Sequence, residues 1–414
     1  MPQIPNEHPT LWIRSTRSDS LKGKTIVLAV TGSIAAVRTV ELAREFIRRG
    51  ADVHAVMSEA AGWIITPMAL QYATGNEVIT AITGKVEHVE FFGNLGRADL
   101  LLIAPATANT LGKIAAGIDD TPVTTFATTA IGAGKPVMIV PAMHEDMYDH
   151  PAVGENIEKM KSWGINFVGP KVEEGIAKIA GNDEIVLEVE RTVGQDSLRG
   201  KKILITSGST AEPIDPIRIL TNRASGKTGN ELALEAYRRG ADVTIVHRNK
   251  LGVTGINEIH AETAAQMTDA VLGELAKGYD MLISAAAIAD YTLDASEQKI
   301  SSGKGLELSF RTTRKLIKEA KEAYPQTKIV GFKAEAGVDS GELLKRARHT
   351  LKDSRLDMIV ANEVSKGGIG TDNNNVTILY SDEKEDLNIE GPKSLIANVL
   401  MDEITLLLEA QDEE

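Results

Sequence analysis

LKGKTIVLAVTGS (Leu21–Ser33) and LRGKKILITSGST (Leu198–Thr210) are two versions of one pattern within the same chain. An amphipathic stretch ending in Arg-Arg-Gly and a second apolar run follow each of them, in ELAREFIRRGADV from Glu41 and ELALEAYRRGADV from Glu231. A short apolar run, a turn of small residues, an amphipathic helix and another apolar run are typical of a right-handed strand–helix–strand unit. The sequence therefore predicts an α/β protein in which a doubly wound parallel sheet begins twice.

Further apolar runs extend both sheets. Continuous apolar character, typical of strands covered on both faces, begins at Asp99, Lys135, Tyr279, Thr327 and Leu356. Helical spacing of apolar residues predicts one helix from Gly341 and another over residues 394–410.

The length of 414 residues exceeds what one hydrophobic core usually organises, so two domains are expected. The boundary falls in the charged stretch EVERTVGQDS, residues 188–197. We expect an N-terminal arm over residues 1–22, a flavodoxin-like domain over 23–190, a linker over 191–199 and a Rossmann-like domain over 200–414.

The two copies differ in length after their first strand. Gly23 and Gly50 are 27 positions apart, whereas Gly200 and Gly240 are 40 positions apart. The additional residues fall in AEPIDPIRILTNRASGK, Ala211–Lys227, at the carboxyl edge of the predicted sheet, where open parallel sheets bind ligands. Its density of Pro, Asp, Arg, Asn and Gly favours a binding loop over a tolerated surface insertion.

The composition excludes several classes of protein. A formal net charge of −13 argues against a broad nucleic-acid-binding face. No apolar run approaches the roughly 20 residues that span a bilayer, and the first 20 residues lack the apolar core of a signal peptide, so we expect a cytoplasmic protein. The chain has no cysteine, which excludes disulfides and a cysteine nucleophile.

Small and polar residues follow three predicted strands of the first half. TGSIAA (Thr31–Ala36) offers backbone amides at a helix start, which is an anion site or a turn needed for packing alone. PATANT (Pro105–Thr110) and PAMHEDMY (Pro141–Tyr148) follow two further strands. Parallel strands end at one edge, so these segments should converge there.

These motifs, together with GKVEHVEFFG (Gly84–Gly93) and KIAAGIDD (Lys113–Asp120), resemble the flavin-dependent cysteine decarboxylase family. The resemblance implies bound FMN and a catalytic histidine at His88. It places Gly32, Ser33 and Ser58 at the FMN phosphate. The residues that it places at the isoalloxazine and the substrate are Ala106, Thr107, Asn109, Met143 and His144.

The first half departs from that family in two ways. His144 and Tyr148 stand where many members have Asn and Trp. Bacterial members of this kind also carry a cysteine in a flap that helps protonate the enethiolate intermediate, whereas the corresponding stretch here is VEEGIAKIAG, Val172–Gly181. His144, Glu174 and Lys178 are the candidates to replace that cysteine.

The second half resembles the phosphopantothenate-cysteine ligase family. The motifs are TSGSTAEPIDPIRILTNRASGKTG (206–229), AAAIADY (285–291), QKI (298–300), VGFKAE (330–335) and IVANEV (359–364). The resemblance implies a nucleotide substrate, usually CTP with Mg2+, and an acyl-nucleotide intermediate that the amine of cysteine opens.

Roles for individual residues follow from this second resemblance. Asn222 stabilises the intermediate and Lys299 serves the second half-reaction. Gly208, Ser209, Thr210 and Lys352 lie near the phosphates, although Ser354 replaces a second lysine of the family. Asp290 lies near the metal and nucleotide, and Phe332, Ala361 and Asn362 lie near the base.

The two resemblances together indicate a bifunctional enzyme of coenzyme A biosynthesis. It would ligate 4'-phosphopantothenate to cysteine with CTP and then decarboxylate the product to 4'-phosphopantetheine. Two alternatives are a flavin-binding regulatory protein of decarboxylase fold and a ligase fused to a decarboxylase of cysteine-ended peptides. We expect a homo-oligomer with active sites at subunit interfaces, and neither nucleic acid nor membrane as a partner.

Overall fold

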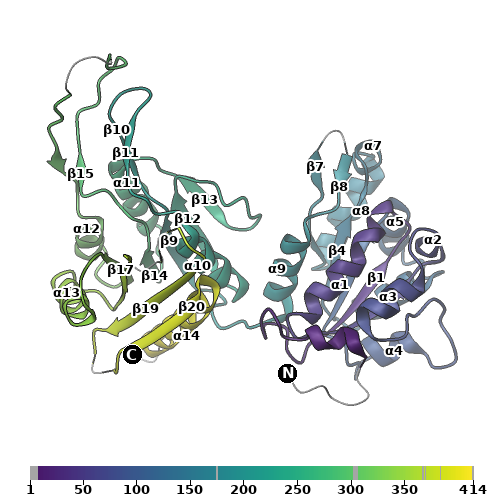
Figure 1. Ribbon diagram of the computed structural model, residues 1–414. Helices are drawn as coiled ribbons and strands as arrows, with labels where there is room; N and C mark the ends of the chain where they lie inside the picture. Colours follow the sequence, from purple (N-terminus) through teal and green to yellow (C-terminus); the bar gives the residue numbers. More distant parts are fainter. Residues whose placement is uncertain are drawn as a thin grey trace. The chain divides into compact units, whose positions relative to one another are not determined.

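The chain folds into two compact units, Met1–Gln195 and Asp196–Glu414. The computed structural model describes residues 8–173, 176–301, 306–365, 368, 370–382 and 384–412, with side chains omitted over 171–178 and 411–412. Both units are α/β with a largely parallel sheet, so the predicted fold class is confirmed (Figure 1).

The first unit is built on a five-stranded parallel sheet. Its order is β2 (Asp52–Met57), β1 (Thr25–Val30), β3 (Leu100–Ala106), β4 (Val137–Pro141) and β6 (Asn166–Phe167). All seven residues of β3 are buried, as the continuous apolar run predicts.

Helices cover both faces of this sheet. Alternate residues of β1 point to opposite faces, so Ile26 and Leu28 pack in one core and Val27 and Ala29 in the other. The first core includes residues of α1 (Thr39–Ile47), α3 (Pro67–Thr74) and α9 (Asn182–Val193). The second includes residues of α4 (Glu87–Phe92), α5 (Ala108–Ala116), α6 (Pro122–Gly132) and α8 (Pro151–Ser162). Shorter elements are η1 (Pro9–Ile13), η2 (Ile34–Arg38), α2 (Glu59–Gly62) and α7 (Glu145–Tyr148).

Helix α9 occupies the start of the segment expected to be a linker. It continues to Val193, and Ile185, Val189 and Val193 are buried on its inner face. Apolar residues at helical spacing therefore extend the first unit beyond residue 190 in spite of the charged residues between them.

The second unit contains an eight-stranded sheet. Six parallel strands come first, in the order β13 (Asn257–His260), β12 (Asp242–His247), β9 (Lys202–Ser207), β14 (Met281–Ser284), β17 (Lys328–Glu335) and β18 (Met358–Glu363). Strands β19 (Asn373–Tyr380) and β20 (Leu387–Pro392) complete one edge in antiparallel orientation, which the sequence analysis did not predict. The helices are α10 (Lys227–Arg238), α11 (Ala264–Leu275), α12 (Leu316–Ala323), α13 (Ser340–Asp353) and α14 (Lys393–Asp412).

The inserted segment forms a hairpin outside the main sheet. Strand β10 (Ala211–Pro213) pairs antiparallel with β11 (Ile219–Thr221), and β15 (Tyr291–Thr292) pairs with β16 (Arg311–Thr312) nearby in the fold. Figure 1 shows the hairpin and the β15 segment extending from the same end of the sheet. We call the described residues of 211–221 and 291–312 the arm.

Candidate active sites

Hydrogen bonds join the ends of β1, β3 and β4 in the first unit. The Thr31 hydroxyl donates to the Pro105 carbonyl at 2.7 Å and accepts the Thr107 N–H at 3.2 Å. The Ala142 N–H donates to the Ala106 carbonyl at 3.0 Å. The motifs predicted to converge at the strand ends therefore do so.

A glycine is required where the turn after β1 meets α2. A Cβ on Gly32 would lie 2.6 Å from the Cβ of Ala60. The Ser58 N–H donates to the Val30 carbonyl at 3.1 Å, and its hydroxyl caps α2 by accepting the Ala61 N–H at 3.3 Å. Gly32, Ser33 and Ser58 are half-buried neighbours of this turn, where backbone amides and hydroxyls suit a phosphate.

At the carboxyl end of β3, the side-chain amide of Asn109 is open to a ligand. Thr107 caps α5 by accepting the Thr110 N–H at 3.3 Å, which fixes the start of the helix. Asn109, in its first turn, is exposed, and its side chain makes no hydrogen bond within the described part of the chain. Ala106 is fully buried in β3 and Met143 is nearly so, which makes them walls and not polar contacts.

His144 lies beside the flap segment. Strand β5 (Met143–His144) pairs with β8 (Ile176–Lys178), which pairs with β7 (Lys171–Glu173). His144 is exposed and opposite Ile176 in this register. Glu174 and the Lys178 side chain lie outside the described residues.

His88 and Asn109 lie on different helices of the first unit. His88 lies on α4, which precedes β3, whereas Asn109 lies on α5, which follows β3. Figure 1 shows α4 and α5 in different parts of the first unit. The Nδ1 atom of His88 is buried and has no hydrogen-bond partner in the described part of the structure.

The second unit has a cavity of about 710 Å³ at the carboxyl ends of β9, β14, β17 and β18. Five predicted residues line it: Gly208, Asn222, Asp290, Phe332 and Asn362. The Asn222 Nδ2 donates to the Ala287 carbonyl at 3.0 Å, which fixes the orientation of this amide.

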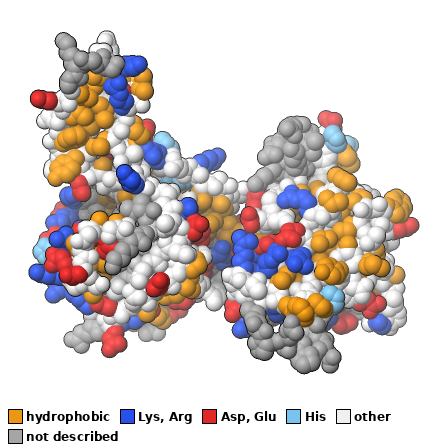
Figure 2. All heavy atoms as spheres, viewed as in Figure 1, with side chains coloured by type: hydrophobic (Ala, Val, Ile, Leu, Met, Phe, Trp, Pro, Cys, Tyr) orange, Lys and Arg blue, Asp and Glu red, His pale blue; other side chains and the backbone are white. Residues whose placement is uncertain are grey.

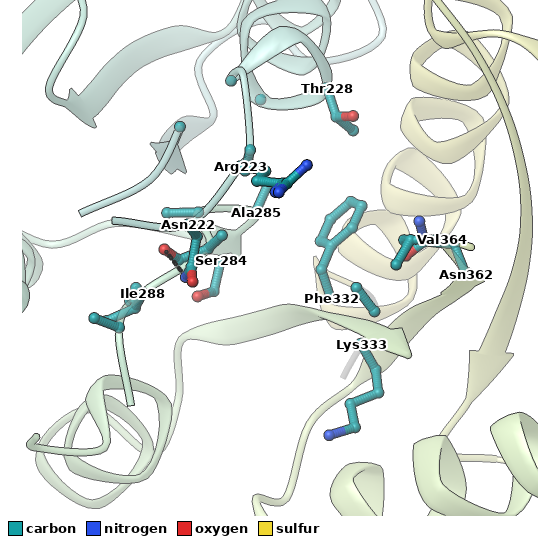
Figure 3. Close-up of a pocket in the computed structure, with 18 of the residues that line it drawn as sticks. Asn222, Arg223, Thr228, Ser284, Ala285, Ile288, Phe332, Lys333, Asn362 and Val364 are labelled. Carbon is teal, nitrogen blue, oxygen red and sulfur yellow. Dashed lines mark hydrogen bonds between the residues drawn. The ribbon is translucent and has the colours of Figure 1, made fainter. Parts of the chain in front are cut away.

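Opposite walls of the cavity offer different chemistry. Figure 3 shows Asn222 and Ile288 on one side, and Phe332 and Asn362 on the other. Phe332 is half-buried, with a ring suited to stacking on a base. The Asn362 side chain is 9% exposed and makes no hydrogen bond in the part of the chain described here, so its amide is open to a ligand.

The N-terminus of α10 opens into the same cavity. No side chain caps it, and Gly226 precedes it with φ of +81°. The Ser207 hydroxyl donates to the Gly226 carbonyl at 3.0 Å, and a Cβ on Gly229 would lie 2.5 Å from that hydroxyl oxygen. Glycine therefore permits the close approach of helix and strand that leaves free N–H groups for an anion.

Two lysines stand at the starts of α10 and α14. Lys227 pairs with Asp372 at 2.6 Å, and the buried Lys393 donates from Nζ to the Thr371 carbonyl at 2.6 Å. Burial, together with the neighbouring charge of Lys227, lowers the pKa of Lys393. Both lysines line the cavity and add positive charge near the α10 N-terminus.

Known proteins match the chain over nearly its full length. The family described as "DNA/pantothenate metabolism flavoprotein C-terminal domain" matches residues 198–407, and the family described as "Flavoprotein" matches residues 14–194. The coenzyme A biosynthesis bifunctional protein CoaBC of Thermococcus kodakarensis is 48% identical over 406 residues, covering 97% of this chain and 100% of that protein. The chain belongs to the CoaBC family.

Other members and one solved structure were also found. The CoaBC protein of Bacillus subtilis is 33% identical over 408 residues, covering 92% of this chain and 97% of that protein. The crystal structure of a CoaBC C-terminal domain matches at 29% identity with a TM-score of 0.44, covering 52% of this chain and 100% of that chain. None of the described helices of this CoaBC chain is long and apolar enough to cross a bilayer.

Three residues predicted near the nucleotide serve the fold of this CoaBC chain instead of lining its cavity. The Ser209 hydroxyl is hydrogen-bonded to the Thr221 hydroxyl, and the Thr210 hydroxyl accepts the Ala289 N–H at 2.9 Å. Ala361, a residue of β18, is 1% exposed and packs in the hydrophobic core. These side chains point inward because the turn after β9 and the end of β18 are themselves buried.

Two predicted lysines also lie away from the cavity lining. Lys352 is exposed on α13, whereas Thr350 of that helix and Ser354 at its C-cap line the cavity. A shift of two residues turns a side chain by about 200° around a helix, which carries Lys352 to the outer face. Lys299 is exposed on the arm.

Five residues of this region were not predicted from the sequence. Arg223, Lys227, Lys315 and Lys393 line the cavity, and Arg223 makes no ion pair or hydrogen bond within the described residues. The position of Arg223 and Lys227 in the inserted segment was an available signal. Buried Asp215, described below, had the same signal.

Asp290 lines the cavity but has an exposed side chain, paired with Lys315 at 2.7 Å. Among the described residues, no group of three or more His, Cys, Asp or Glu side chains has the arrangement of a metal site.

Proposed function

We propose that this chain ligates 4'-phosphopantothenate to cysteine with CTP and Mg2+ in its second unit and decarboxylates the product with FMN in its first. The observation that carries the proposal is the presence of both strand-end sites in one member of the CoaBC family. The two reactions are sequential, because the product of the ligase is the substrate of the decarboxylase. The chain is thus a bifunctional enzyme of coenzyme A biosynthesis.

Ligation takes place in two steps at the cavity. The carboxylate of 4'-phosphopantothenate attacks the α-phosphorus of CTP and releases pyrophosphate. The amine of cysteine then attacks the acyl carbon and releases CMP. Asn222 donates to the acyl phosphate with the amide hydrogen that is not bound to Ala287, where charge develops during both steps.

Different walls of the cavity bind different parts of CTP. Phe332 stacks on the base and Asn362 provides its amide to the polar edge of the base. The free N–H groups of α10 bind the phosphates together with Lys227, next to the backbone of Gly208. Asp290 lies near the Mg2+ that the phosphates carry, while Ser209, Thr210 and Ala361 support these walls from behind.

A second copy of the chain completes the ligase site. Lys299 is exposed on the arm. Ile217, Tyr291 and Phe310, also on the arm, expose 66%, 56% and 47% of their surface. Figure 2 shows hydrophobic side chains gathered along this projecting part. Contact with a second copy buries them and delivers Lys299 to the partner's cavity, whereas Lys352 makes no contact with CTP.

FMN fits the strand-end site of the first unit. The phosphate of FMN suits the turn at Gly32, where a Cβ is not tolerated, and the hydroxyls of Ser33 and Ser58. The polar ring system suits the open side-chain amide of Asn109. Gly32, Ser33 and Ser58 would hold the phosphate, and Ala106, Thr107, Asn109 and Met143 would border the ring. Bound FMN supplies the oxidation of the cysteine thiol and the later return of its electrons.

Two histidines act on the decarboxylase substrate: one binds its carboxylate and the other transfers a proton. His144 donates a hydrogen bond to the substrate carboxylate under the flap. His88, whose buried Nδ1 has no hydrogen-bond partner among the described residues, transfers a proton in an active site formed with a second copy. The chain has no cysteine for the final protonation. Of the three candidates to replace it, His144 is the one whose side chain the structure describes, and we assign this step to it.

One experiment tests both activities. The purified chain, which should be yellow, is incubated with 4'-phosphopantothenate, cysteine, CTP and Mg2+, and products are identified by mass spectrometry. We expect pyrophosphate, CO2 and 4'-phosphopantetheine. Phosphopantothenoylcysteine that accumulates without release of CO2 would remove the decarboxylase, and absence of any ligation product would remove the ligase.

A further inference from the structure

Asp215 is a buried carboxylate in the turn between β10 and β11. Its side chain has no exposed surface. Oδ1 accepts the N–H groups of Ile217 and Arg218, both at 2.8 Å. Oδ2 accepts Nη1 of Arg218 at 2.9 Å and the N–H of Ile300 at 3.2 Å. The carboxylate therefore has four donors, of which one belongs to a segment more than 80 residues further along the chain.

Further contacts tie that distant segment to the hairpin. Nη1 of Arg218 also donates to the Ile300 carbonyl at 3.1 Å, and the Ser296 N–H donates to the Ile214 carbonyl at 3.0 Å. Ile300 thus uses both its N–H and its carbonyl on the Asp215–Arg218 pair. The backbone directly after Lys299 is fixed, while the Lys299 side chain remains exposed.

The same hairpin leads into Asn222. Strand β11 ends at Thr221, whose hydroxyl donates to the Thr210 carbonyl at 2.8 Å, and Asn222 comes next. Asn222 is then held through its bond to Ala287. One short hairpin therefore joins the base of the Lys299 segment to the amide at the cavity.

Only a carboxylate satisfies this set of donors. Burial opposes ionisation of Asp215, but the hydrogen bonds from Ile217, Arg218 and Ile300 outweigh it and lower its pKa. An Asn side chain has one oxygen and one NH2 group, so it would direct two donors at two other donors. Buried donors without acceptors are costly, and the local geometry would change.

We propose that Asp215 is a positioning residue for ligation, which fixes the Lys299 segment to the hairpin that carries Asn222. The inference rests on the proposed roles of Lys299 and Asn222. Asp215 touches no substrate in this scheme. Its effect passes through the backbone at Ile300.

The first test is Asp215→Asn in the full chain. We expect kcat for ligation to fall by about 10-fold or more, the loss that a misplaced catalytic group produces. The KM for CTP should stay within about twofold, because Asp215 does not line the cavity. Decarboxylation of supplied phosphopantothenoylcysteine by the same preparation should be unchanged. An unchanged kcat for ligation, or a KM for CTP raised as much as kcat falls, would overturn the proposal.

A matched control lies on the same segment. Asp294 is exposed and forms an ion pair with Arg311, so Asp294→Asn makes the same chemical change without disturbing Ile300. Its ligation rate should stay within about twofold of the unaltered chain, as expected for an exposed ion pair. A loss equal to that of Asp215→Asn would show that the arm is sensitive to any lost charge, and would overturn the specific role of Asp215.

A double-mutant cycle separates positioning from general damage. If Asp215 acts through Lys299, then adding Asp215→Asn to Lys299→Ala should lower kcat no further than about twofold, because the positioned group is already absent. Losses that multiply would overturn the proposal.

Arg218→Gln provides a second variant if Asp215→Asn does not fold. It removes the bridge to the Ile300 carbonyl but keeps both backbone bonds of Oδ1, and it must also lower kcat for ligation. An unchanged rate would overturn the inference. Absence of ligation by the unaltered chain would instead reject the proposed function itself.

Discussion

The two units start with the same strand–helix–strand frame, and equivalent residues in the two frames make equivalent hydrogen bonds. The fully buried Leu21 and Leu198 donate their N–H groups to the carbonyls of Arg49 and Arg239, both at 2.9 Å. Asp99 and Asp280 each accept the N–H at the start of the neighbouring first strand at 2.7 Å. The repeated sequence therefore specifies a repeated local structure.

Equivalent arginines connect each frame to the last helix of its unit. Arg49 pairs with Glu45 and, at 3.2 Å, with Glu190 of α9. Arg239 pairs with Glu235 at 2.8 Å and with Asp402 of α14 at 2.7 Å. Both arginines are at most 10% exposed in their side chains. The partner on α9, Glu190, is also buried, whereas the partner on α14, Asp402, is 56% exposed.

The difference between the units lies in the turn after the first strand. In the first unit this turn passes directly into η2, whereas in the second it contains the hairpin of the arm. Both turns stand at the carboxyl edge of a parallel sheet, where ligands bind. The shared frame therefore stabilises both units, whereas the inserted residues change the chemistry at the carboxyl edge of the second sheet.

The largest expected effect tests whether the two sites work separately. Asn222→Asp places a negative charge beside the phosphates and should lower the ligation rate about 100-fold or more. His88→Gln should lower decarboxylation of supplied phosphopantothenoylcysteine by about 100-fold. Each variant should keep the other activity, measured in the same preparation by pyrophosphate and CO2 release. Loss of both activities in either variant would contradict the separation.

A second prediction tests the shared arginines. Arg49→Met and Arg239→Met each remove a buried guanidinium that pairs with a largely buried carboxylate, Glu45 or Glu235, so each should lower the free energy of unfolding of its own unit by about 2 kcal/mol. Flavin release reports the first unit, and loss of ligation reports the second, during denaturant unfolding.

Neighbouring arginines supply the controls for that prediction. Arg48 and Arg238 have side chains that are 25% exposed and pair with the same carboxylates, Glu45 and Glu235. Arg48→Met and Arg238→Met should cost no more than about 1 kcal/mol. Equal losses in the controls would show that the buried arginines have no special place in the frame.

The smallest expected effect is a difference in pH dependence between the units. Burial is the main cause that lowers the pKa of His247 below its usual 6.5, against the opposing charge of Glu258. The folded second unit therefore binds fewer protons than its unfolded form, and it loses stability as the pH falls below 6.5. In the first unit, Asp52 has a pKa lowered to about 2, mainly by its hydrogen bond to His54, so that contribution is lost only below 3.8.

Thermal unfolding at pH 7.5 and pH 5.5 measures this difference. The temperature at which ligation is lost should fall by about 2–4 °C more than the temperature of flavin release, as expected for a change of about 1 kcal/mol. His247→Gln keeps a donor for Glu258 but cannot titrate, and it should remove the difference. An equal shift in both units of the unaltered chain would contradict the assignment to His247.

The sequence by itself determined the repeated frame, the main parallel strands and the edge at which the polar motifs meet. These features depend on local patterns, because apolar runs select buried strands and the order of strand and helix selects a parallel sheet. Asn222, Phe332 and Asn362 were grouped by the resemblance of their motifs to the ligase family, and all three line one cavity.

Only the tertiary structure decided where side chains point and which distant segments meet. The inward hydroxyls of Ser209 and Thr210 and the outward side chain of Lys352 depend on packing around each backbone position. The pairing of Asp215 with Ile300 joins segments that no sequence period relates. A motif fixes the order of residues along the chain, whereas burial and long-range hydrogen bonds fix their directions in space.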